Sequence, residues 1–122
     1  MSVQRQQLGR AGEQRAADFL RRAGYRILAS NYRTRRGELD LVAEEGGELV
    51  FVEVKTRTSL AFGSPAEAVD SRKQRRIGRA AQEYLLREGA SERAVRFDVV
   101  AISLAAGRPE IEIIKNAFEY GG

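Results

Sequence analysis

Two β-type runs joined by a pair of glycines constrain the fold of this chain more than any other feature. Residues 38–43 alternate between leucine or alanine and other side chains, and residues 49–54 read Leu-Val-Phe-Val-Glu-Val. Gly46-Gly47 lies between the runs, and such a pair is typical of a tight hairpin loop. The sequence therefore predicts an antiparallel hairpin, and the other elements must pack around it.

A helix and a strand are expected before this hairpin. Small and apolar residues recur at i, i+4, i+8 spacing over residues 4–23, namely at Leu8, Gly12, Ala16 and Leu20. Gly24 ends the predicted helix, because glycine is the commonest residue just after a helix. Residues 25–32 read as a first strand, and the polar residues 34–37 read as a turn.

A second helix and two more strands are expected after the hairpin. Ser64-Pro65-Ala66-Glu67 has the cap, the first-turn proline and the capping-box glutamate of a helix start, with a restart near Asp70-Ser71. Helical spacing continues as far as Gly89, and strands are predicted over residues 96–102 and 111–114. The order α-β-β-β-α-β-β predicts an α/β fold with a single mixed β-sheet flanked by helices, in one domain spanning residues 1–122.

Composition excludes several classes of chemistry. The chain has no cysteine and no histidine, so thiolate nucleophiles, zinc fingers and imidazole catalysis are excluded, and carboxylates, hydroxyls, Lys and Arg remain. Hydrophobic residues make up 43% of the chain, which is enough for a buried core. No apolar run is long enough to span a bilayer, and the polar start lacks a secretory signal, so we expect a cytoplasmic protein with no membrane partner.

Charge is unevenly distributed along the chain. Residues 1–36 carry a net charge of +7, residues 37–70 of −6, residues 71–96 of +5 and residues 97–122 of −2. An acidic segment between two basic segments is typical of a nucleic-acid enzyme. In such an enzyme a carboxylate cluster holds a cation, and the surrounding basic surface attracts the phosphate backbone. The alternative interpretation is ordinary solvated surface with uneven charge.

The hairpin brings two carboxylates together. If Gly46-Gly47 forms a two-residue loop, Asp40 lies opposite Glu53 and Glu38 lies opposite Lys55, and we expect all four side chains on one face. Opposed like charges destabilise a sheet, so a shared Mg²⁺ or Mn²⁺ ion is the simplest explanation. Lys55 would then orient or deprotonate an attacking water. The alternative is a solvent-facing ribbon with ordinary charge pairs.

These motifs resemble a known family. Gly9-x-x-Gly12-Glu13-x-x-Ala16, the Gly-Glu-Leu-Asp-Leu-Val run of residues 37–42, the Phe-Val-Glu-Val-Lys-Thr-Arg run of residues 51–57 and the Arg-Phe-Asp-Val-Val run of residues 96–100 occur in the order of the YraN-type family. This is a group of predicted bacterial endonucleases in the PD-(D/E)XK nuclease superfamily, similar to archaeal Holliday-junction resolvases. Leu39 stands where the superfamily name has proline.

The resemblance implies a restriction-endonuclease-like fold and metal-dependent hydrolysis of DNA. By residue, Asp40 and Glu53 match the metal ligands, Lys55 matches the catalytic lysine, and Glu13 matches a glutamate carried by the first helix. The spacing of Glu13 supports its assignment as a ligand, because it shares a helix face with Ala16 and Leu20, and an inward carboxylate is costly unless it is paired or metal-bound. A salt bridge to an arginine is the alternative.

Other charged residues are expected to support this site. We expect Glu38 to act through Lys55, with a plain salt bridge as the alternative. Basic side chains on both sides of the carboxylates are expected to contact phosphates, although solvated surface is the alternative for each one. They are Arg33, Arg35, Arg36, Arg57, Arg72, Lys73, Arg75, Arg76 and Arg79. Tyr84 and Phe97 are expected in the core, and Asp98 beside a buried arginine, outside the site.

The predicted function is a Mg²⁺- or Mn²⁺-dependent endonuclease whose partner is DNA, with branched or structured DNA as a candidate substrate. A four-way junction needs two symmetric cuts, so a homodimer is a further hypothesis. The alternative is a catalytically silent nuclease-fold protein that binds or scaffolds DNA. A plain α/β interaction module without a nucleic-acid partner is the third hypothesis.

Overall fold

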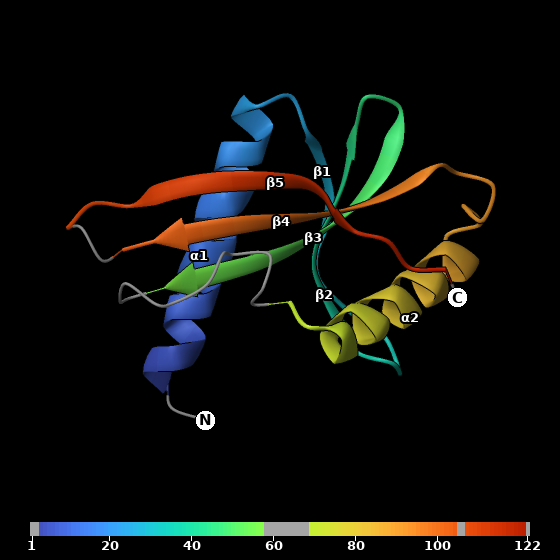
Figure 1. Ribbon diagram of the computed structural model, residues 1–122, viewed down its shortest axis with the longest axis horizontal. Helices are drawn as coiled ribbons and strands as arrows, with labels where there is room; N and C mark the ends of the chain where they lie inside the picture. Colours follow the sequence, from blue (N-terminus) through green and yellow to red (C-terminus); the bar gives the residue numbers. More distant parts are fainter. Residues whose placement is uncertain (1–2, 58–68, 105–106, 122) are drawn as a thin grey trace.

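The computed structural model describes residues 3–57, 69–104 and 107–121. Its elements follow one another in the order α1 (Val3–Arg22), β1 (Arg26–Arg33), β2 (Glu38–Glu45), β3 (Glu48–Arg57), α2 (Ser71–Arg87), β4 (Val95–Ser103) and β5 (Glu110–Phe118) (Figure 1). The predicted order α-β-β-β-α-β-β is therefore confirmed. Within these residues, no helix is long and apolar enough to cross a membrane.

The start of α2 agrees with the predicted restart. Asp70 is its N-cap, and the Asp70 side chain accepts a hydrogen bond from the Lys73 backbone N–H at 2.9 Å. This bond satisfies one of the backbone donors that a helix leaves free at its first turn. The earlier helix start predicted at Ser64–Glu67 lies outside the described residues.

The five strands form one mixed sheet in the order β1-β2-β3-β4-β5. Neighbouring strands are antiparallel except β3 and β4, which are parallel and are connected through α2. The last strand extends beyond the predicted residues 111–114. Asn116 takes a left-handed conformation (φ 53°) at a shift in the register, and the strand resumes its pairing after it. Pairing therefore continues from Val99↔Ile114 to Phe97↔Phe118.

The two helices cover opposite faces of the sheet. Ala16 and Leu20 of α1 pack on one buried cluster, and Ile77, Ala80 and Tyr84 of α2 pack on the other. The α2 side is aromatic: the rings of Phe51, Phe97 and Phe118 stack in succession, and Tyr84 meets Phe51 edge to face. The predicted core positions of Tyr84 and Phe97 are thus confirmed.

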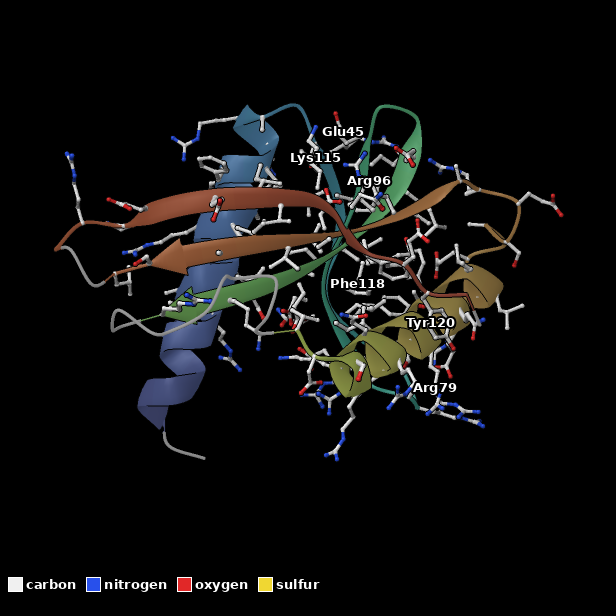
Figure 2. The ribbon with its side chains drawn as sticks, viewed as in Figure 1. Glu45, Arg79, Arg96, Lys115, Phe118 and Tyr120 are labelled. Atoms are coloured by element: carbon white, nitrogen blue, oxygen red, sulfur yellow. The ribbon has the colours of Figure 1, made fainter. Side chains whose placement is uncertain are left out.

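A buried polar network joins the strands away from the carboxylates. Asp98 is fully buried and accepts hydrogen bonds from Arg96 Nε at 2.9 Å, Tyr25 Oη at 2.7 Å and the Asn116 backbone N–H at 2.9 Å. Arg96 also pairs with Glu45, and Lys115 approaches the same glutamate (Figure 2). The predicted pairing of Asp98 with an arginine is confirmed, although Arg96 is partly exposed and not fully buried. Because every oxygen of this carboxylate is satisfied, the network is structural.

Candidate metal centre

The β2–β3 hairpin has the predicted register but opens at the carboxylates. Its pairing runs from Glu45↔Glu48 to Leu41↔Val52, so Asp40 and Glu53 lie directly beyond the last pair. There, Asp40 Oδ2 accepts a hydrogen bond from the backbone N–H of Val54 at 2.9 Å. The side chain of Asp40 thereby occupies the position at which the two strands separate.

Side-chain alternation along β2 breaks at this opening. Leu39 packs into the cluster under α2, whereas Leu41 packs into the cluster under α1, so the strict alternation predicted for residues 38–43 is wrong at Leu39. On β1, Asn31 lies between the residues paired with Leu39 and Leu41 and has a left-handed backbone (φ 53°). A left-handed residue interrupts the regular pleat. Because of this irregular stretch of β1 and β2, Asp40 lies near Glu13 of α1 and Lys73 of α2.

Three carboxylates gather at the break. Glu13 of α1 and Glu38 and Asp40 of β2 each offer an oxygen atom, and these atoms all lie within 4.8 Å of one another. The pairing of β2 with β3 ends before both predicted opposed pairs, so neither Asp40 with Glu53 nor Glu38 with Lys55 forms a strand pair. Glu38 pairs with Arg33 of β1 and forms an ion pair with it at 3.5 Å, which is the plain salt bridge given as the alternative. The inward position predicted for Glu13 is confirmed.

A close contact between α1 and β3 holds Glu13 in this place. A Cβ atom on Gly12 would overlap the hydroxyl oxygen of Thr56, so a larger residue there requires the threonine side chain or the helix to shift. The Asn31 side chain lies near Glu13 and lowers the pKa of its carboxyl group, against the larger effect of burial. Sequence reasoning missed Asn31, because nothing in its local pattern distinguishes it from a polar strand residue.

Glu53 lies beside the cluster with two lysines. Its side chain is only 8% exposed, and its Oε2 atom is 3.0 Å from Lys73 Nζ and 3.9 Å from Lys55 Nζ. Lys73 was predicted as a phosphate contact on the surface of α2, and the structure places it against Glu53 instead. The signal was in the sequence, since Lys73 precedes Ile77, Ala80 and Tyr84 at helical spacing and so shares their buried face.

Electrostatics favour a cation at this centre. Burial, followed by the charge of Glu53, raises the pKa of Asp40 to about 8, and burial also raises the pKa of Glu13. Burial and the neighbouring Lys73 lower the pKa of Lys55. Asp40 and Glu13 are therefore poorly neutralised by the protein alone, whereas Glu53 pairs with Lys73. An all-oxygen donor set of this kind fits Mg²⁺ or Mn²⁺, so the residues that could hold such an ion are Glu13, Glu38, Asp40 and Glu53.

Exposed arginines lie on α2 and on the turn between β1 and β2. We call the group formed by α2 and the β1–β2 turn the arginine face; its members are Arg35, Arg36, Arg72, Arg75, Arg76 and Arg79. Within the described part of the chain, none of these guanidinium groups forms an ion pair. The side chain of Arg76 lies over Gly37, and this contact joins the β1–β2 turn to α2. Arg79 projects from the outer side of α2 (Figure 2).

The remaining predicted phosphate contacts are placed differently. Arg33 lies close enough to pair with Glu38, as described above. Arg57 is half-buried at the end of β3, where its backbone carbonyl accepts a hydrogen bond from the Leu104 N–H at 2.8 Å.

Comparisons with known proteins identify relatives along almost the whole chain. The family model described as "Uncharacterised protein family UPF0102" matches residues 12–102. A UPF0102 protein of Symbiobacterium thermophilum is 53% identical over 112 residues, covering 91% of this chain and 95% of its own length. Another from Anaeromyxobacter dehalogenans is 51% identical over 118 residues, covering 97% and 88%. One from Rhodococcus jostii is 54% identical over 112 residues, covering 91% and 95%.

Proposed function

Because the chain belongs to the uncharacterised protein family UPF0102, we propose its function from its own site: it is a cytoplasmic Mg²⁺- or Mn²⁺-dependent endonuclease that hydrolyses DNA phosphodiester bonds. The observation that carries this proposal is the acidic cluster that contains Glu13 and Asp40, with Glu53 and Lys55 of a third element beside it. The resemblance of the motifs to PD-(D/E)XK nucleases supports the same chemistry.

Each residue at the centre has a role in this proposal. Asp40 and Glu53 would hold the cation with help from Glu13, and Glu38 completes the acidic cluster. When bound, the cation supplies Lewis-acid stabilisation of the phosphate and a more acidic water. The lowered pKa of Lys55 makes its neutral amine more accessible near neutral pH, as a base beside the carboxylates requires.

The reaction is a hydrolysis with a simple balance. The oxygen of a water molecule forms a bond to phosphorus while one ester P–O bond of the DNA backbone breaks. The water loses a proton to the Lys55 amine, and the departing sugar oxygen takes up a proton from solvent. The products are one hydroxyl end and one phosphate end, and no oxidant or second substrate is needed.

The arginine face supplies the binding part of the proposal. Unpaired guanidinium groups suit phosphate oxygens, which they can contact through two parallel hydrogen bonds. Phosphate contacts carry no base information, so we propose recognition by DNA shape, with branched or structured DNA as candidate substrates. If the substrate is a four-way junction, a two-fold homodimer supplies the two cuts.

The experiment that tests this function is a cleavage assay on labelled linear, nicked, flapped and four-way-junction DNA with Mg²⁺, Mn²⁺ or EDTA. Asp40→Asn serves as the matched variant, because it removes one ligand charge with little change in volume. We expect metal-dependent cleavage by the wild type and a loss of at least about 100-fold in the variant, as for removal of a group that stabilises the transition state.

Two other outcomes would replace the proposal. Folded protein that binds these DNAs with strong salt dependence but cuts none of them would identify a catalytically silent DNA-binding protein. Folded protein that neither binds DNA nor responds to Mn²⁺ would identify a protein-interaction module.

A further inference from the structure

The lysines of this chain are few and unevenly placed. The sequence has 18 arginines and only 3 lysines, and two of the three, Lys55 and Lys73, lie against the buried carboxylate of Glu53. The third, Lys115, is at the opposite end of the sheet beside Glu45. Almost all basic side chains of this chain are arginines, but the two that lie against Glu53 are both lysines.

Lys73 is the nearer of the two ammonium groups to Glu53. Its Nζ atom lies 3.0 Å from Glu53 Oε2, against 3.9 Å for Lys55, and its side chain is 25% exposed. The first turn of α2 fixes its backbone, since the Lys73 N–H bonds to the Asp70 cap. Arg72 and Arg76 on the same turns are exposed members of the arginine face. Lys73 therefore stands between the metal centre and the phosphate-binding surface.

We propose that Lys73 is a movable counter-ion that couples cation binding to phosphate binding, a regulation that rests on the proposed function. While no cation is bound, Lys73 neutralises Glu53. Binding of a cation at Glu53 would displace the ammonium group of Lys73, which would then be free to contact a phosphate of the DNA. Lysine suits this role because its compact charge sits on a flexible stem, whereas the planar fork of arginine would hold the carboxylate in a fixed two-point contact.

The same contact has a simpler interpretation, in which the Lys73–Glu53 pair only fastens α2 to the sheet. The two differ in what happens to cation affinity. A counter-ion competes with the cation for Glu53, so its removal strengthens cation binding. A fastening pair gives no competition, and its removal loosens Glu53 and weakens cation binding.

The test is Mn²⁺ titration of the full chain, without DNA, followed by the electron paramagnetic resonance signal of free Mn²⁺. Lys73→Met keeps the length of the stem and removes the charge. Lys115→Met is the matched control, with the same chemical change and the same net charge. We expect Lys73→Met to bind Mn²⁺ about tenfold more tightly than the wild type, and Lys115→Met to bind it as the wild type does. Unchanged or weaker binding by Lys73→Met would overturn the proposal.

A second measurement needs no variant and so does not depend on the folding of Lys73→Met. With three lysines in the chain, the ¹³Cε resonances can be assigned individually. We expect the Lys73 signal of the wild-type protein to shift on addition of Mg²⁺, while the Lys115 signal stays in place. A Lys73 signal that does not respond to saturating Mg²⁺ contradicts displacement from Glu53.

The link to DNA is tested separately with a non-cleavable phosphorothioate duplex. Coupling between two ligands is reciprocal, so the duplex should tighten Mn²⁺ binding several-fold in the wild type and less than twofold in Lys73→Met. If the protein binds no DNA at all, the proposed function fails, while the Mn²⁺ titration still decides whether Lys73 is a counter-ion. If DNA binds but tightens Mn²⁺ equally in both proteins, the coupling is wrong.

Discussion

The side chain of Asp40 is placed in a way that favours cation binding and lowers the stability of the metal-free fold. It is held next to Glu53 and Glu13, and burial together with these charges raises its pKa to about 8. Its side chain accepts a hydrogen bond from Val54 N–H, which a neutral amide oxygen can also accept. In the absence of metal, the charge of Asp40 therefore opposes folding.

We expect Asp40→Asn to stabilise the metal-free protein by about 1 kcal/mol, or roughly 4 °C in Tm for a domain of this size. The measurement is thermal unfolding followed by circular dichroism in EDTA and then in Mn²⁺. Added Mn²⁺ should raise the Tm of the wild type and leave the variant almost unchanged. Asp18→Asn is the control, since Asp18 is exposed and pairs with Arg21 on the surface of α1. A variant that is less stable than the wild type in EDTA would show that the carboxylates are already neutralised within the protein.

Among the elements, the contact of α1 with β3 decides where Glu13 lies. Gly12 touches Thr56 where any side chain would overlap the threonine hydroxyl, although the threonine Cβ is far enough away to remain. We expect Gly12→Ala to lower stability by about 1–2 kcal/mol and to weaken Mn²⁺ binding by shifting Glu13 outward. Adding Thr56→Ala removes the overlapping oxygen, so the double variant should recover most of both losses. A double-mutant cycle of Tm and Mn²⁺ affinity measures this, and additive losses would contradict it.

The elements also show what the sequence could predict. The hairpin register was predictable, because a two-glycine loop determines which residues pair on either side. The position of Glu13 was predictable from helical spacing, and the position of Lys73 could have been found in the same way. The break at Leu39 and the left-handed Asn31 were not predictable, since they depend on where β2 separates from β3 and on the helices packed on each side.

For the whole molecule, the relevant quantity is how positive charge is divided between paired and unpaired arginines. Arg21, Arg26 and Arg93 are committed to ion pairs with Asp18 or Glu44. Arg72, Arg75 and Arg79 belong to the arginine face and form no such pair within the described residues. The net charge of +4 does not reveal this difference between paired and unpaired arginines. The difference nevertheless determines which arginines can release counterions from DNA.

We therefore expect two triple variants with identical charge changes to behave differently. Changing Arg72, Arg75 and Arg79 to Gln should reduce the slope of log K against log salt by about 0.9 for each phosphate that the protein no longer neutralises, or roughly 2–3 in total. Changing Arg21, Arg26 and Arg93 to Gln should leave that slope within about 0.5 of the wild type, because these groups pair with carboxylates. Fluorescence anisotropy of a labelled duplex between about 50 and 200 mM salt covers the range over which electrostatic binding to DNA weakens steeply. Equal slopes for the two variants would mean that net charge alone attracts DNA, and the arginine face would then have no special place in binding.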